Sequence, residues 1–232
     1  MNAILIDWQN IETVFLDMDG TLLDLHFDNH FWLEHMPKRY AEKHSISVEQ
    51  ASNTLSQKTT AIAGSLDWYC LDYWEKTLDM DIIDLKHEVA DRIAIRANVI
   101  EFLDYLRGIN KRVVLLTNAH HKTIKLKFGY ADIKHHFDRI ITAHDVGLAK
   151  EQDGFWQALE KVEDFTKTQS LFIDDNLDVL NTANDYGVKH LLAIHQPDSQ
   201  QPIKDTQGYI PIECYTQLMA SNLSDSDLRP SV

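Results

Sequence analysis

The chain has 232 residues, of which 44% are hydrophobic, and its formal net charge is −14. This length and apolar content predict a globular protein with a packed core, either one large domain or a core domain with a smaller insert. The acidic balance, together with the lack of any cluster of lysine and arginine, argues against a nucleic-acid partner, because nucleic-acid binding requires basic side chains that displace counterions.

The N-terminus and the hydrophobic pattern suggest a cytoplasmic protein. Met1 to Gln9 lacks the basic region and the long apolar stretch of a secretory signal. No run approaches the roughly 18 apolar residues of a membrane span, so we expect no membrane partner. Cys70 and Cys214 are far apart without a CxxC pair, and we expect reduced thiols. The twelve histidines form no HExxH or similar pattern, and we interpret most of them as surface residues.

The first strong pattern is a short apolar run that ends in two carboxylates. Val14 to Leu16 predicts a strand with both faces covered, and Asp17 and Asp19 follow at its carboxyl end. Residues two apart in an extended segment point the same way, and two charges about 4 Å apart repel by roughly 4 kcal/mol at an effective dielectric near 20. The pair therefore needs a cation or a shared proton. The alternative is a solvated Asp-Gly turn at Gly20.

The next segment, from about Asp28 to Ile95, is helical throughout. Leu22 to Asp28 is expected to form a hinge into it, and Asp28 is either an N-cap of the first helix or a polar residue at the mouth of a cleft. Ser47 and Gln50 predict a capping box. The pattern predicts an all-α insert with further helices over 47–63, 67–78 and 81–94. The helix over 67–78 carries many aromatic residues between Trp68 and Trp74.

After the insert, strand and helix patterns alternate. Strands are expected over 111–116, 139–142, 170–173 and 190–194, and helices over 98–106 and 154–162. This alternation predicts a Rossmann-like parallel sheet of about five strands with helices on both faces. From Pro197 onward we expect irregular structure, with one helical segment around 212–219 and a frayed end over 221–232.

Polar residues recur where these later strands end. Thr117 and Asn118 follow the second strand, and Asp174 and Asp175 follow the fourth, while Lys150 precedes a helix. In open α/β sheets this edge binds ligands. Thr117 and Asn118 could instead cap the next helix, and Lys150 could be an exposed loop lysine.

Together these residues resemble the four motifs of the haloacid dehalogenase superfamily of phosphohydrolases: Asp17-x-Asp19-Gly20-Thr21, Thr117-Asn118, Lys150 and Asp174-Asp175, in this order and over nearly the whole chain. The segments Phe27 to Trp32 and Trp68 to Trp74 further resemble the bacterial GMP/IMP 5′-nucleotidases. The resemblance implies a catalytic core of residues 1–25 and 96–232, with a helical cap, residues 26–95, that determines substrate specificity.

The resemblance also implies a mechanism. Asp17 would be the nucleophile that forms an aspartyl phosphate, and Asp19 the general acid and base. Thr117, Asn118 and Lys150 would bind the phosphoryl group. Mg²⁺ would be held by Asp17, the backbone carbonyl of Asp19 and Asp175, with Asp174 outside the inner shell.

We expect the substrate to be a small phosphomonoester, in particular a purine 5′-mononucleotide. Asn29 and His30 are candidates for a contact to the 6-oxo group of the base. The alternatives are a small sugar-phosphate phosphatase or a phosphomutase of the same superfamily. A haloacid dehalogenase needs no second aspartate such as Asp19, and a non-catalytic binding protein would be favoured by the loss of a catalytic residue, which is not observed. The sequence does not indicate the oligomeric state.

Overall fold

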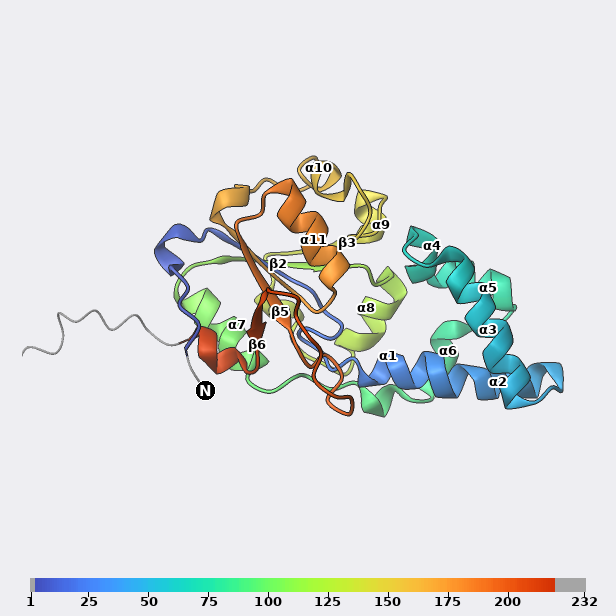
Figure 1. The fold of residues 1–232 in the computed structure, drawn as a ribbon. Coiled ribbons are helices and arrows are strands. Elements are labelled where there is room, and N and C mark those ends of the chain that lie inside the picture. Colours follow the sequence, from blue (N-terminus) through green and yellow to red (C-terminus); the bar gives the residue numbers. More distant parts are fainter. Residues whose placement is uncertain (1–2, 220–232) are drawn as a thin grey trace, which may run out of the picture.

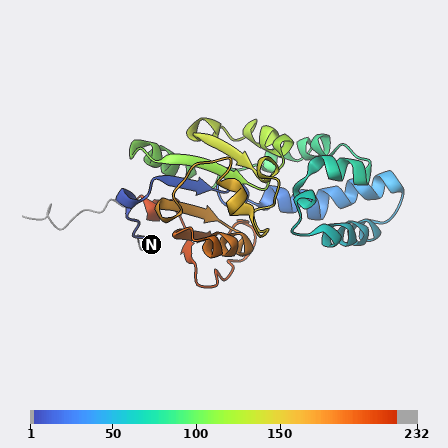
Figure 2. The same cartoon turned by 90° about the horizontal axis from the view of Figure 1, so that it is seen from above.

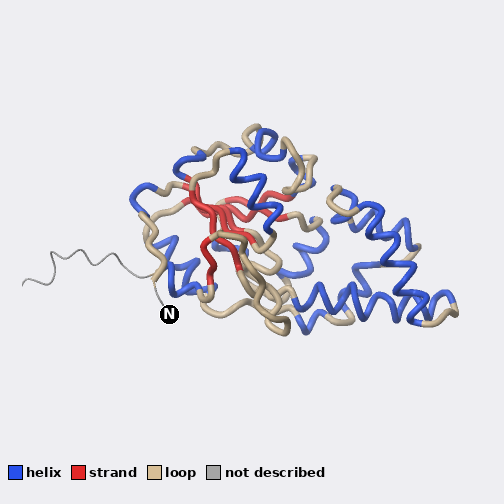
Figure 3. Tube along the Cα trace, in the orientation of Figure 1, coloured by secondary structure: helices blue, strands red, loops and turns tan. Residues whose placement is uncertain are grey.

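A parallel sheet forms the centre of the computed structural model, which describes residues 3–219 (Figures 1 and 3). Its strand order is β3-β2-β1-β4-β5-β6, and every pairing is parallel. The strands are β1 Thr13–Leu16, β2 Arg112–Thr117, β3 Arg139–Thr142, β4 Ser170–Asp174, β5 His190–Ile194 and β6 Ile210–Ile212. The first strand therefore lies inside the sheet between β2 and β4, as expected for a Rossmann-like fold.

The expectation of about five strands missed β6. This strand is a three-residue edge strand, Ile-Pro-Ile, in a segment that we expected to be irregular. Proline has no N–H to donate, so it is tolerated at a sheet edge, and three residues are too few to show a period. The helical segment expected over 212–219 is only a short 3₁₀ turn at Tyr215–Leu218. The segment expected to fray, 221–232, lies outside the described residues.

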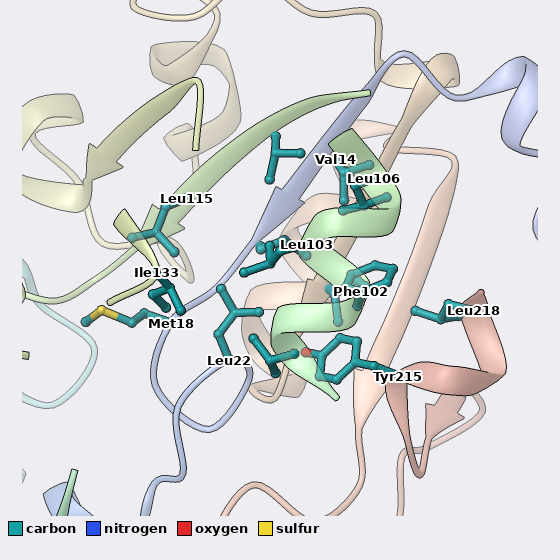
Figure 4. Close-up of a cluster of buried hydrophobic side chains, with 14 of the residues drawn as sticks. Val14, Met18, Leu22, Phe102, Leu103, Leu106, Leu115, Ile133, Tyr215 and Leu218 are labelled. Atoms are coloured by element: carbon teal, nitrogen blue, oxygen red, sulfur yellow. The ribbon is translucent and has the colours of Figure 1, made fainter. Parts of the chain in front are cut away.

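Both faces of the sheet are buried, which confirms the interpretation of the first strand. Val14 and Leu16 pack on one side with α7 (Val99–Gly108), as Figure 4 shows for Val14, and Phe15 packs on the other. That second side is covered by α10 (Phe155–Leu159) and α11 (Leu177–Tyr186). The helix expected over 154–162 is thus shorter than predicted. Two further helices, α8 (His121–Phe128) and α9 (Ala143–Val146), follow β2 and β3.

The segment between β1 and α7 is all helical and packs around its own apolar cluster, including Phe31, Trp74 and Ile82. Figure 2 shows it beside the sheet domain rather than over either sheet face. Its elements are α1 His26–His30, a π-helical turn Phe31–His35, α2 Met36–His44, α3 Val48–Ile62, α4 Leu66–Tyr69, α5 Leu71–Leu78, α6 Ile82–His87 and a 3₁₀ turn Ala90–Arg92.

Local signals predicted some of these helix ends and missed others. The capping box is present, because the Ser47 hydroxyl accepts from the Gln50 amide at 3.1 Å and the Gln50 side chain accepts from the Ser47 amide at 3.0 Å. The predicted helix over 67–78 is interrupted at Cys70, whose backbone is extended (φ −84°, ψ 111°). The helix expected over 81–94 ends at His87. Asp28 is not an N-cap, since α1 already begins at His26.

Two chain segments connect the helical part with the sheet part, and they lie side by side. The Asp24 amide donates to the Ala94 carbonyl at 2.9 Å, and the Arg96 amide donates to the Leu22 carbonyl at 3.0 Å. An antiparallel bridge between Leu23 and residue 95 lies between these bonds. This paired connection is the expected place for a hinge. Within the described residues, every helix is too short or too polar to cross a membrane.

Candidate active site

Three carboxylates converge at the carboxyl ends of β1 and β4. Leu16 pairs with Ile173 in the sheet, so Asp17 and Asp174 come next to each other in register. Asp17 is 5% exposed and Asp174 is 1% exposed. Single carboxylate oxygens of Asp17, Asp174 and Asp175 all lie within 4.8 Å of one another. Because these charges are buried together, they require a positive partner.

Lys150 supplies part of that charge. Its Nζ lies 2.6 Å from Asp17 Oδ1 and 2.6 Å from Asp174 Oδ2, and it also donates to the Leu116 carbonyl at 3.1 Å. Burial by itself lowers the pKa of Lys150, but the two carboxylates outweigh burial and raise its pKa above the usual value. Lys150 is therefore a charged, buried residue and not an exposed loop lysine.

Asp175 is the carboxylate with the fewest close partners. Asp174 has both oxygens occupied, by Lys150 and by the Asn176 amide at 2.8 Å, whereas among residues 3–219 the cationic partner of the Asp175 carboxylate is Lys204 Nζ, at the longer distance of 3.6 Å. Burial, followed by repulsion from Asp174 and Asp17, raises the pKa of Asp175 to about 8. An all-oxygen cluster of repelling carboxylates is the kind of donor set that a hard divalent cation binds. These residues therefore fit a metal such as Mg²⁺.

Gly20 allows the close approach of the first strand's turn to Asp175. Its φ is +82°, and a Cβ there would lie 2.8 Å from Asp175 Cγ and 2.9 Å from Pro197 Cβ. Any side chain would collide with both residues and would also disfavour this backbone conformation. The Asp-Gly turn expected at Gly20 is present. It forms part of the site and does not leave the two aspartates in solvent.

Asp19 has a different partner from Asp17. The Lys127 Nζ lies 2.5 Å from Asp19 Oδ1 and contacts Asp28 as well, while Lys86 lies 3.0 Å from Asp28 Oδ1. These four residues form a chain of alternating charges from the end of β1 into the helical segment, with both lysines buried and both aspartates partly buried. Burial is the largest influence on the pKa of Asp19, and it raises the value to about 6 although the Lys127 ammonium opposes it.

Thr117 is the last residue of β2, and Asn118 begins the loop that follows. The Thr117 hydroxyl accepts from the Ala119 amide at 3.0 Å, and the N-cap of α8 is His120, so neither predicted residue caps that helix. The Asn118 side chain accepts from the Lys150 amide at 2.9 Å and donates to Glu151 at 2.9 Å. Asn118 thus joins the second and third motifs.

A cavity of about 690 Å³ lies between the sheet edge and the helical segment. Asn29 lines it and donates to Asp198 at 2.7 Å. His30 is not among the lining residues, and its Nδ1 lies 3.4 Å from Glu34. Of the predicted site residues, the cavity is lined by Asp17, Asp19, Asn29, Thr117, Asn118, Lys150, Asp174 and Asp175.

Aromatic residues line the side of the cavity formed by the helical segment. Trp74 is 1% exposed and donates its indole N–H to the Trp68 carbonyl at 2.8 Å, so it belongs to the core of that segment. Tyr69 donates its hydroxyl to Glu151 at 2.6 Å. Trp68, at 39% exposure, is the ring among these with a large free surface.

The comparison with protein-family models identifies the family. The model for haloacid dehalogenase-like hydrolases matches residues 11–187, a range that contains all four motifs. The chain belongs to this family of hydrolases.

Similar proteins agree with the assignment to the haloacid dehalogenase-like hydrolases. The GMP/IMP nucleotidase YrfG of Escherichia coli (strain K12) is 35% identical over 93% of this chain and 97% of its own. The HAD phosphatase from Thermococcus onnurineus has a similar structure, with a TM-score of 0.69 at 19% identity, over 89% of this chain and 95% of that chain. L-2-haloacid dehalogenase from Xanthobacter autotrophicus has a TM-score of 0.61 at 15% identity, over 90% of this chain and 97% of that chain. At these identities the two structures show the shared fold only.

Three charged residues that contact the site of this hydrolase were not predicted from the sequence. Lys127 and Lys86 stabilise Asp19 and Asp28, and Glu151 connects Asn118 with Tyr69. A weak signal for Lys127 was available, since it follows the buried Ile124 by three residues and so shares the apolar face of α8. Nothing in the local sequence distinguishes Lys86 from a surface lysine.

Proposed function

We propose that this hydrolase is a Mg²⁺-dependent phosphomonoesterase that acts on purine 5′-mononucleotides through an aspartyl phosphate. In this proposal residues 26–95 are a cap that closes over the core. The observation that supports it best is the buried Asp17 carboxylate, held by Lys150 beside Asp174 and Asp175, on the floor of a cavity that the helical segment completes.

The proposed reaction has two displacements at phosphorus. In the first, the Asp17 carboxylate forms a bond to phosphorus as the ester P–O bond breaks, and Asp19 gives its proton to the departing alkoxide. In the second, water attacks phosphorus while Asp19 takes back a proton, and the bond to Asp17 breaks to release phosphate. Lys150 and Thr117 stabilise charge on the phosphoryl oxygens.

The proposed metal ligands are Asp17, Asp175 and the backbone carbonyl of Asp19. A bound Mg²⁺ would neutralise negative charge between the carboxylates and the phosphoryl group. Asp174 is assigned to a supporting position, because Lys150 and the Asn176 amide already occupy its two oxygens.

The metal assignment predicts which of two variants needs the higher Mg²⁺ concentration for half-maximal activity. Asp175→Ala is expected to raise the Mg²⁺ concentration for half-maximal activity at least tenfold, which corresponds to about 1.4 kcal/mol. Asp174→Ala is expected to raise it less, because it removes no direct ligand. Mg²⁺ titrations of activity, supported by calorimetric binding, measure both, with the exposed Asp178→Ala as control. The opposite ordering, or full activity in EDTA, would contradict the assignment.

The substrate proposal predicts a preference among nucleotides. GMP and IMP are expected to be hydrolysed with higher catalytic efficiency than AMP, UMP or a hexose phosphate. The support is the 35% identical GMP/IMP nucleotidase, together with the Trp68 ring in the cavity wall. Stacking of a base on an aromatic ring stabilises binding by roughly 1–3 kcal/mol. Asn29, which lines the cavity, remains the candidate for a 6-oxo contact, whereas the structure does not bring His30 there.

A Trp68→Ala variant tests recognition of the base independently of recognition of the phosphoryl group. Its efficiency is expected to fall roughly 5- to 150-fold for GMP and to change little for a hexose phosphate. Tyr130→Ala is a matched control, since Tyr130 is exposed and lies outside the cavity lining. A hexose phosphate as best substrate would favour a general sugar phosphatase. Equal rates for AMP and IMP would retain a nucleotidase without the 6-oxo contact.

A further inference from the structure

A second group of metal-type ligands lies where the helical segment meets the sheet part. One ligand atom each of Cys70, His120 and His144 lies within 4.8 Å of the other two. Cys70 is the extended residue between α4 and α5, His120 precedes α8, and His144 lies in α9. In Figure 1, α4 stands opposite α9, with α8 below them. The interruption of the predicted helix at Cys70 places this thiol next to the two imidazoles.

The imidazole of His144 packs against other rings, but its nitrogens are left without polar contacts within residues 3–219. Both of its nitrogens are buried, and neither has a hydrogen-bond partner among the described residues. Its ring lies edge-on to His120, with centroids 4.8 Å apart. Burial of both rings lowers their pKa values, which favours neutral imidazoles that keep a lone pair. A buried polar group without a partner costs about 1–3 kcal/mol, so a ligand is the simplest explanation for its retention.

We propose that Cys70, His120 and His144 bind a divalent transition-metal ion of the Zn²⁺ class and thereby link the helical segment to the core. Thiolate and imidazole are the ligands that such ions prefer, whereas Mg²⁺ prefers oxygen ligands such as those proposed at Asp17 and Asp175. The two clusters would therefore select different metals.

The geometry requires only small movements. Zn–S and Zn–N bonds of about 2.3 and 2.0 Å place tetrahedral ligand atoms roughly 3.5 Å apart, so the present separations need to shrink by at most on the order of 1 Å. Cys70 gives up its thiol proton to the solvent when the metal–sulfur bond forms. His120 Nδ1 accepts from the Lys122 amide at 3.4 Å, so a metal at Nδ1 would replace this long hydrogen bond and leave the Nε2 proton facing Asp72 Oδ2, 3.7 Å away, which would orient the ring.

Other contacts already join α4 and α5 to the core at this place. The metal would therefore strengthen an existing interface. Lys122 of α8 lies 2.7 Å from both Asp72 and Glu75 of α5, and Tyr69 donates to Glu151. Surface ion pairs of this kind contribute little each. A metal bridge would therefore be the strongest single link between α4 and the core, and it would restrict opening of the cavity.

The test uses Co²⁺ as a spectroscopic substitute for Zn²⁺ on the full-length protein. Wild type is expected to show a near-ultraviolet thiolate-to-cobalt charge-transfer band that Zn²⁺ removes and excess Mg²⁺ does not. Cys70→Ser and His144→Gln are expected to lose the band or weaken Co²⁺ binding at least tenfold. Cys214→Ser and His135→Gln are the matched controls, because Cys214 contacts Asn98 and His135 lies on a separate exposed turn.

The second readout is hydrogen exchange of the α4 amides, which Zn²⁺ is expected to slow at least severalfold in wild type but not in Cys70→Ser. Circular dichroism checks that the variants are folded. The proposed site would be wrong if the band were absent in wild type, persisted in Cys70→Ser or disappeared in Cys214→Ser. Metal binding without slower hydrogen exchange in α4 would show that the metal does not link the helical segment to the core. Neither readout depends on the proposed nucleotidase activity.

Discussion

Asp17→Asn is expected to lower phosphate release at least a hundredfold, about 2.7 kcal/mol in activation free energy, while the protein remains folded. The amide cannot serve as the nucleophile that forms the bond to phosphorus. Folding is expected to survive, because Lys150 still pairs with Asp174 and the variant removes one of three repelling carboxylates. Steady-state phosphate release with GMP and Mg²⁺, together with a thermal melt, measures both effects.

The matched control for this variant is Asp178→Asn, which makes the same chemical change at an exposed position in the first turn of α11. It is expected to leave turnover within about twofold of wild type, since surface substitutions rarely change stability by more than roughly 0.5 kcal/mol. Near-normal turnover by a folded Asp17→Asn protein would end the covalent mechanism.

Lys150→Met is expected to abolish most activity and to destabilise the protein in the absence of divalent metal. Methionine retains much of the side-chain volume but leaves Asp17 and Asp174 without their shared ammonium group, which lies 2.6 Å from each. Removal of one partner from a buried ion pair typically costs about 3–5 kcal/mol. The phosphoryl oxygens also lose a positive partner, so a decrease in phosphate release of roughly a hundredfold is expected.

The effect of Mg²⁺ on the Lys150→Met variant distinguishes the role of Lys150 in stability from its role in catalysis. If Asp17 and Asp175 hold a divalent ion, then Mg²⁺ should restore part of the lost stability without restoring activity, because ligand binding to the folded state raises its stability. Denaturant unfolding with and without Mg²⁺ measures this, and Lys161→Met is the exposed-lysine control. Wild-type activity in Lys150→Met would show that the third motif is misplaced.

The alternation of strands and helices outside the helical segment, and the sheet edge at which the polar residues gather, were determined by the sequence itself. Continuous apolar runs such as Val14 to Leu16 require burial on both faces, and strands separated by helices require parallel crossovers. Parallel strands bring their carboxyl ends to one edge, so polar residues at or directly after these ends, such as Asp17, Thr117 and Asp174, had to meet there. The edge strand at Ile210–Ile212 was too short to carry such a signal.

Contacts between the helical segment and the core were decided only by the tertiary structure. Local sequence records which face of a helix is apolar, but it contains no information on which distant helix that face meets. Nothing local therefore separates Lys86 from a surface lysine, and only the packing of α6 places it beside Asp28. Cys70 and His144 are 74 residues apart in the chain, and their proximity depends on how the helical segment docks on the core. Long-range docking of this kind is determined by the whole packed surface, so no short motif predicts it.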